Sequence, residues 1–156
     1  MPFNVVLYEP EIPPNTGAII RLCANTGAQL HLIKPLGFAW DDKRLRRAGL
    51  DYLALTHVTL HENLAACLAI TAPDRVLACT TKAKTPHSAI AYRPGDVLLF
   101  GPETRGLPES LLNDLPEQNK LRIPMQPDSR SLNLANAVSV VLYEAWRQID
   151  FQGALP

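Results

Sequence analysis

The amino-acid sequence predicts an α/β fold with a mostly parallel sheet that is flanked by helices on both faces. Short runs rich in Val, Leu and Ile alternate with segments of helical periodicity along the chain. Several of these runs are apolar throughout, as in strands that are buried on both faces. The chain has 156 residues, of which 47% are hydrophobic and 19% are charged. This suits one domain, residues 1–156, with a substantial core.

Three expected strands and three expected helices lie in the first half of the chain. Apolar runs mark the strands, at residues 5–8, 30–33 and 57–60. The helices follow them in the chain, at residues 15–26, 42–48 and 62–70. Asn15 is expected to cap the first helix, Gly27 to end it, and Gly49 to end the second.

The second half of the chain predicts three further strands, at residues 75–80, 96–100 and 121–123. Residues 81–94 are too polar and too rich in proline for a long element. A helix at residues 108–115 starts with proline, and the last helix covers residues 132–149. Its apolar stripe is broad enough for both a core and a subunit interface, and consists of Ala135, Val138, Val141, Leu142 and Ala145.

Composition excludes several classes of protein. The longest apolar run, residues 64–70, is far shorter than the ~20 residues that span a bilayer. The first residues lack the basic and apolar regions of a secretion signal. The three cysteines have no CxxC spacing, and the histidines do not pair with cysteine or carboxylate at the spacing of metal ligands. We therefore expect a soluble cytoplasmic protein without a disulfide framework or a metal site.

The charges balance, with 15 Lys and Arg against 15 Asp and Glu, so there is no overall attraction to a polyanion. Four cations nevertheless cluster in one short segment: Lys43, Arg44, Arg46 and Arg47. They form either a solvated helix face or a local patch that contacts phosphate groups.

The loop after the first strand argues against a dinucleotide-binding protein. It reads Glu-Pro-Glu-Ile-Pro-Pro from residue 9 and contains no G-x-G-x-x-G. Acidic side chains would repel a pyrophosphate, and prolines lack amide donors. The P-loop pattern is absent as well.

Three other polar segments each lie at the carboxyl end of a predicted strand. In parallel sheets this is the edge where ligands bind. The first, N-T-G-A-I-I-R, carries Asn15 and Arg21, which are otherwise a plain cap and a surface arginine. The second, F-G-P-E-T-R-G-L at residues 100–107, carries Gly101 and Glu103. Gly101 would let a ligand approach the backbone and Glu103 would point at it; the alternative is a turn with an exposed ion pair.

The third loop begins Ile-Pro-Met at residue 123 and continues to Ser131 and Asn133. These two residues lie at the start of the last predicted helix, whose N-terminus favours polar or anionic ligand atoms. Helix capping alone explains them equally well.

Together, N-x-G-x-x-x-R, F-G-P-E-x-x-G-L and I-P-M…S-x-N-x-x-x-A resemble the three signatures of the SPOUT methyltransferases, in the SpoU branch that methylates ribose 2′-hydroxyls. The resemblance extends over residues 5–146. It implies a deep trefoil knot in the C-terminal third, a homodimer, and S-adenosyl-L-methionine as the cofactor. Residues 7–13, 40–44 and 143–146 resemble members that modify the wobble nucleotide (34) of leucine tRNAs, whether cytidine or modified uridine.

The resemblance also implies roles for single residues. Cofactor contacts would come from Cys79, Gly101, Ile123, Met125 and Ser131. The catalytic group would be Arg21, supported by Asn15, Glu103, Ser131 and Asn133. A guanidinium stays protonated, so Arg21 would bind a phosphate and stabilise a developing oxyanion, with no metal required.

A chain without a separate RNA-binding domain would bind tRNA through its catalytic domain, and residues 43–47 are expected to contribute. Two alternatives remain open: the same reaction on ribosomal RNA, and a cofactor-binding RNA module without turnover.

Overall fold

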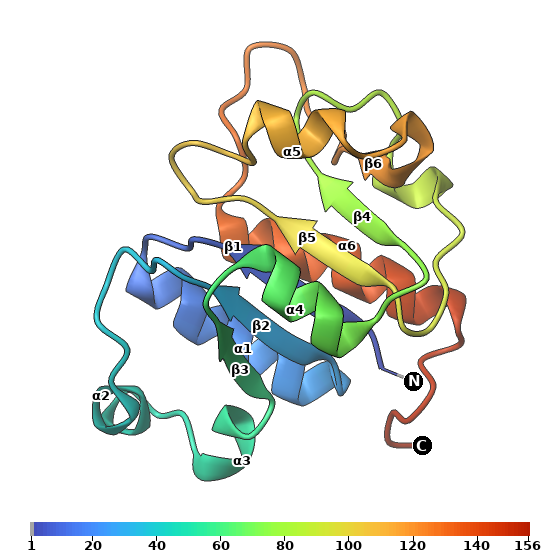
Figure 1. The fold of residues 1–156 in the computed structure, drawn as a ribbon. Helices are drawn as coiled ribbons and strands as arrows, with labels where there is room; N and C mark the ends of the chain where they lie inside the picture. Colours follow the sequence, from blue (N-terminus) through green and yellow to red (C-terminus); the bar gives the residue numbers. More distant parts are fainter. Residues whose placement is uncertain (1) are drawn as a thin grey trace.

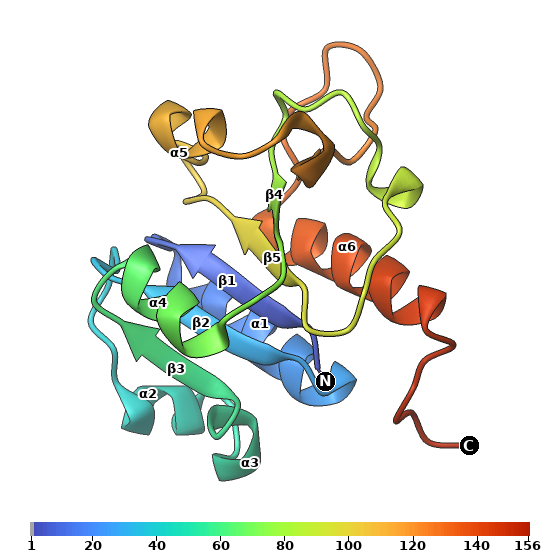
Figure 2. The same ribbon diagram turned by 45° about the vertical axis from the view of Figure 1, so that its right-hand side comes forward.

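The computed structural model describes residues 2–156, which form a six-stranded sheet (Figures 1 and 2). The strand order is β3-β2-β1-β5-β4-β6, and every neighbouring pair is parallel. The α/β fold and all six predicted strands are therefore confirmed. The strands are β1 (Asn4–Tyr8), β2 (Gln29–Ile33), β3 (Val58–His61), β4 (Val76–Cys79), β5 (Val97–Phe100) and β6 (Lys120–Leu121).

Helices cover both faces of the sheet. The long helices α1 (Pro13–Thr26) and α6 (Leu134–Gln148) pack on one face, and α4 (Leu64–Thr71) and α5 (Glu109–Asn113) pack on the other (Figure 2). Two short helices, α2 (Asp42–Arg47) and α3 (Tyr52–Leu55), connect β2 to β3. Single 3₁₀ turns occur at His87–Ala89 and Glu117–Asn119.

The middle of the central strand β1 is apolar because both of its faces are covered. Val5 and Leu7 belong to the cluster beneath α1 and α6, whereas Val6 belongs to the cluster beneath α4. All three side chains are fully buried, because successive residues of a strand point to opposite faces. Burying each one stabilises the fold by about 1.5–3 kcal/mol, so the buried positions of a strand covered on both faces favour apolar residues.

The helix starts differ from the sequence predictions. α1 begins two residues early at Pro13, with Ile12 as the N-cap and no capping side chain, so Asn15 lies inside the first turn and is buried. Proline suits this position because it has no N–H to leave unpaired. α6 is capped by Asn133, whose Oδ1 accepts hydrogen bonds from the amides of residues 135 and 136, and not by Ser131. Gly27 ends α1 with φ 80°, as predicted.

Two further differences concern short elements. The four-residue helix α3 was not predicted, because one turn is too short to show helical periodicity. The last strand, predicted at residues 121–123, is confined to Lys120–Leu121. The chain beyond it pairs with another loop instead: the Arg122 amide donates to the Thr85 carbonyl, and the His87 amide donates to the Arg122 carbonyl.

The strand order reverses beside β1. The chain moves from β1 outward through β2 to β3. It then crosses to β4, returns to form β5 between β1 and β4, and ends at the far edge with β6. The loops that follow β1 and β5 therefore meet at one edge, where parallel sheets commonly bind ligands. Within residues 2–156, each helix is too short or too polar to cross a lipid bilayer.

Candidate active site

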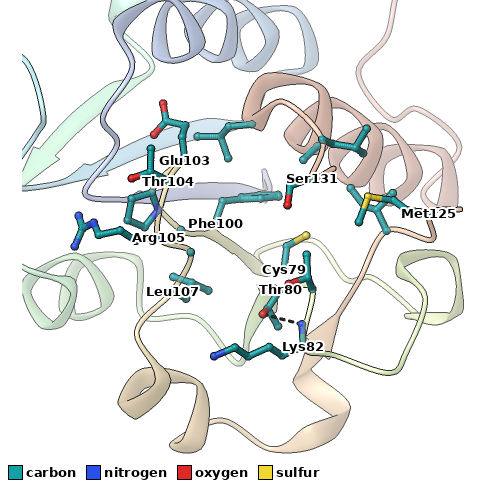
Figure 3. Close-up of a pocket in the computed structure, with 18 residues that line it drawn as sticks. Cys79, Thr80, Lys82, Phe100, Glu103, Thr104, Arg105, Leu107, Met125 and Ser131 are labelled. Carbon is teal, nitrogen blue, oxygen red and sulfur yellow. Dashed lines mark hydrogen bonds between the residues drawn. The ribbon is translucent and has the colours of Figure 1, made fainter. Parts of the chain in front are cut away.

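A cavity of about 310 Å³ opens at the carboxyl ends of β4 and β5 (Figure 3). Its walls come from the loops after β4, β5 and β6 and from the first turn of α6. The apolar side chains of Phe100, Leu107 and Leu134 share these walls with the hydroxyl-bearing residues Thr80 and Ser131. Mainly apolar cavities of roughly 300–1,000 Å³ with a few polar groups are typical of sites for small organic molecules.

The five residues expected to contact a cofactor all line this cavity: Cys79, Gly101, Ile123, Met125 and Ser131. Burial raises the pKa of the Cys79 thiol to about 12, so the group is neutral. A neutral thiol packs against a ligand and does not act as a thiolate nucleophile. The ligand contacts themselves stay a prediction, but the five residues share one cavity, as that prediction requires.

The loop after β5 folds back on itself at two glycines. The amide of Gly106, which has φ 69°, donates to the Pro102 carbonyl at 2.9 Å. A Cβ atom on Gly101 would lie 2.4 Å from the amide nitrogen of Leu107 and 2.5 Å from the carbonyl carbon of Gly106. The space beside Gly101 is therefore filled by the chain's own backbone, not reserved for a ligand as the sequence suggested. Gly101 is needed to shape the loop.

Glu103 joins this loop to the start of α1. Its two carboxylate oxygens accept hydrogen bonds from the amides of Glu11 and Ile12, both at 2.8 Å, and from Asn15 Nδ2 at 3.3 Å. Asn15 Oδ1 in turn accepts from Asn133 Nδ2 at 2.9 Å, next to the cap of α6. Glu103, Asn15 and Asn133 thus form one hydrogen-bonded network. Each of the three comes from a different sequence motif, so the network links all three motifs.

In a second contact between the same two segments, the acceptor is Glu11 just before α1 and the donor is in the loop after β5. The Glu11 carboxylate accepts hydrogen bonds from the amide and hydroxyl of Thr104, and these bonds lower its pKa. Arg105 approaches Glu9 at 3.3 Å and Glu11 at 3.6 Å. The alternative interpretation of the second loop, a turn with its own exposed ion pair, is therefore wrong, because Arg105 pairs with the acids that follow β1. Sequence reasoning missed Glu11 and Thr104, although two acids after one strand and an arginine after its neighbour were a usable signal.

Arg21 lies outside the cavity of its own chain. It is exposed, and its Nη2 donates to the Gly49 carbonyl at 2.6 Å, beside a separate hollow that includes Arg44. Asn15 and Arg21, the two residues of the first motif, point in different directions. Six residues along a helix of 3.6 residues per turn place two side chains about 120° apart, so Asn15 faces inward while Arg21 faces solvent.

The basic segment forms α2, and its helical structure is confirmed. Asp41 caps it, since Oδ1 accepts hydrogen bonds from the amides of Lys43 and Arg44. All four predicted RNA contacts are exposed: Lys43, Arg44, Arg46 and Arg47. Arg44 lies 3.8 Å from Asp41, a distance at which an exposed pair contributes little.

A parallel α/β sheet with a ligand-sized cavity at its carboxyl edge is typical of proteins that bind a small organic molecule there. The chain belongs to the SpoU rRNA Methylase family, whose model matches residues 2–143. It is 66% identical to the tRNA (cytidine(34)-2′-O)-methyltransferase of Escherichia coli (strain K12), over 97% of each chain. The resemblance to the SpoU branch is thereby confirmed, and the chain is a member of a methyltransferase family.

Solved structures agree with this assignment. One, described as giving structural insights into the 2-OH methylation of C/U34 on tRNA, is 46% identical, with a TM-score of 0.84, and the match covers 95% of this chain and 96% of that one. An AdoMet-bound rRNA methyltransferase from Sinorhizobium meliloti is 25% identical, with a TM-score of 0.77. That match covers 95% of this chain and 57% of the other.

Replacing Glu103 by glutamine tests the network. One carboxylate oxygen becomes an NH₂ group that faces amide donors, so one or two hydrogen bonds are lost and two donors oppose each other. We expect the free energy of unfolding to fall by about 1–3 kcal/mol, as measured by urea denaturation. The exposed Glu62→Gln, which breaks only the Lys34 ion pair, is the control and should change stability by less than about 1 kcal/mol. Equal effects of the two variants would contradict the assigned network.

Proposed function

We propose that this protein methylates the ribose 2′-hydroxyl of nucleotide 34 in tRNA, in leucine tRNAs in particular. The observation that carries the proposal is the cavity lined by Cys79, Gly101, Ile123, Met125 and Ser131, the residues at which the family signatures require a cofactor site. The near full-length similarity to tRNA (cytidine(34)-2′-O)-methyltransferases supports the position of the methyl group. We also propose that the enzyme acts in the cytoplasm.

The cofactor we propose is S-adenosyl-L-methionine. The cavity has a suitable volume and offers both apolar walls and polar groups, which an adenosine and an amino-acid moiety need. Residues from the ends of β4 and β5 and from the loop after β6 would hold it, with Ser131 adding a hydroxyl. When bound, this cofactor supplies an electrophilic methyl group.

The chain's own residues would orient the ribose and stabilise the negative charge that develops on its 2′-oxygen. Arg21 stays protonated, so it binds a phosphate and stabilises the oxyanion, while the departing proton goes to phosphate or water. Asn15, Glu103 and Asn133 bond to one another and to backbone, so they act as positioning residues that fix α1 against the cavity loop.

We propose a homodimer in which Arg21 serves the cavity of the partner chain. Support comes from Arg21 being exposed and outside the cavity of its own chain. In the α6 stripe, Val138, Val141, Leu142 and Ala145 are buried in the chain's own core. The surface left for a partner includes Val140 and Tyr143, which are 38% and 43% exposed. The trefoil knot is likewise a proposal, supported by family membership.

Neutralising two cations of α2 tests the proposed tRNA contact. Lys43→Gln with Arg47→Gln removes two exposed charges, so we expect weaker tRNA binding and a slope of log K against log salt that is smaller by about 1–2. The control on the same helix is Asp42→Asn, which removes a negative charge and should leave binding equal or tighter. Filter binding at several salt concentrations measures both. An unchanged slope would exclude α2 from the RNA interface.

Nucleoside mass spectrometry of RNA from a deletion strain tests the function itself. We expect one 2′-O-methylated nucleoside to disappear from leucine tRNA, and the intact gene to restore it. Unchanged tRNA with altered ribosomal RNA would favour the rRNA alternative. No change in either RNA would favour a cofactor-binding module without turnover.

A further inference from the structure

Two histidines and a cysteine meet on the face of the sheet that α4 covers. His31 on β2, His61 at the end of β3 and Cys67 on α4 each offer one ligand atom, and these atoms all lie within 4.8 Å of one another. The residues are only 6%, 4% and 0% exposed, and none lines the cavity described above. The spacing of these residues along the chain gave no sign of the cluster, because only parallel pairing of β2 with β3 and packing of α4 bring them together.

Hydrogen bonds prepare His31 as a ligand. Its Nε2 lies 3.0 Å from Asn4 Oδ1, and an amide oxygen only accepts, so Nε2 carries the hydrogen. His31 Nδ1 is then an unprotonated nitrogen, and it accepts a hydrogen bond from His61 Nε2 at 2.9 Å. A metal-binding histidine has this same arrangement, with one ring nitrogen held by an oxygen and the other directed at the ion.

The charges of the cluster also suit a cation. Burial, aided by His61, lowers the pKa of His31 to about 4, and burial lowers that of His61 as well. Both imidazoles are therefore neutral at pH 7. Burial raises the pKa of the Cys67 thiol to about 11, so an ion has to displace its proton.

We propose that His31, His61 and Cys67 form a three-donor site for a thiophilic ion of the Zn²⁺ and Cu⁺ class. With Zn²⁺, which is tetrahedral, water would supply the fourth ligand. One thiolate and two imidazoles are the donors these ions prefer. For Zn²⁺, bonds of about 2.0–2.1 Å to nitrogen and 2.3 Å to sulfur place the donors about 3.3–3.6 Å apart. The two nitrogens need to separate by about 0.4 Å and the sulfur to move closer, shifts within reach of side-chain rotation.

The binding step is balanced without any redox change. The ion forms a bond to Cys67 Sγ as the S–H bond breaks, and that proton leaves to solvent. The His61 proton moves from Nε2 to Nδ1, so Nε2 can ligate while His31 keeps its hydrogen bond to Asn4. The ion would fasten β3, which is an edge strand, to β2 and α4.

Titration of the chelator-treated protein tests the site. Binding of Zn²⁺ is measured by competition with a chromophoric chelator. We expect one ion to bind per chain, one proton to be released and Tm to rise. Co²⁺ should give sulfur-to-cobalt charge-transfer absorption, and a parallel titration with Cu⁺ under reducing, oxygen-free conditions decides between the two ions. Cys67→Ser should abolish the charge-transfer band and weaken binding by about 10–100-fold or more.

The matched control is Cys23→Ser, a fully buried thiol on the opposite face of the sheet, in the α1 and α6 cluster. It should leave the spectrum and stoichiometry unchanged. His61→Gln provides a second variant should Cys67→Ser not fold. Equal metal binding by all variants, or no binding of either ion, would overturn the proposal and leave a hydrogen-bonded histidine pair in the core. None of these measurements uses methyltransferase activity, so they are independent of the proposed function.

Discussion

Replacing Arg21 by alanine is expected to slow methyl transfer to tRNA by about 10²–10³-fold, the usual cost of losing one group that stabilises an oxyanion. Affinity for S-adenosyl-L-methionine should stay within a few-fold, because in the proposed mechanism Arg21 serves the RNA phosphate and the transition state and not the bound cofactor. Single-turnover kinetics and calorimetry separate the two effects. Arg21→Lys is the matched control: it keeps the charge but loses the planar fork, so part of the activity should remain.

Mixed dimers test whether the site is shared between chains. Arg21→Ala leaves the cavity intact, and Ser131→Trp is designed to fill the cavity while leaving Arg21 intact. If Arg21 serves the partner chain, one of the two sites in each mixed dimer contains both functional parts, and activity returns on mixing. A mixture as inactive as its components would contradict the shared site. A loss of cofactor affinity in Arg21→Ala as large as its loss of activity would contradict the assigned role of Arg21.

Replacing Gly101 by alanine is expected to lower the free energy of unfolding by about 1–3 kcal/mol and to weaken cofactor binding. The added Cβ would lie 2.4 Å from the Leu107 nitrogen and 2.5 Å from the Gly106 carbonyl carbon, so backbone has to move. That movement displaces the loop that carries Glu103 and Thr104 and lines the cavity. Thermal unfolding and calorimetry with S-adenosyl-L-homocysteine, the product of the proposed reaction, measure the two effects.

Gly17→Ala is the matched control for stability. Gly17 lies inside α1, and a Cβ there would have no heavy atom within 4 Å. Because glycine is a poor helix former, this change should raise the free energy of unfolding by about 0.5–1 kcal/mol. If Gly101→Ala were as stable as the natural chain and bound the cofactor equally well, the close backbone approach would have no energetic weight.

Some predictions succeeded because a local pattern is sufficient to determine them. The six strands follow from apolar runs, since burial on both faces favours apolar residues at positions 5–7 of β1 and throughout β5. The αL end of α1 follows from Gly27, which has no Cβ to oppose positive φ. The family follows from the order and spacing of three motifs, and the five expected cofactor residues share one cavity.

Other features depend on which segments become neighbours, and no local pattern contains that information. Asn15 looked like a helix cap, but Pro13 starts the helix and Asn15 bonds instead to Glu103 and Asn133. The hydrogen bonds between Glu11 and Thr104 form because β1 and β5 are adjacent where the strand order reverses.

The strands, the family and the residues around the cavity were predictable from the amino-acid sequence, because they follow from burial periodicity and from motif spacing. Tertiary structure alone decided that Arg21 lies away from its own cavity, and that His31, His61 and Cys67 meet in the core. The physical reason is that helix phase and parallel strand pairing set which side chains meet, and both are fixed only when the whole sheet is assembled.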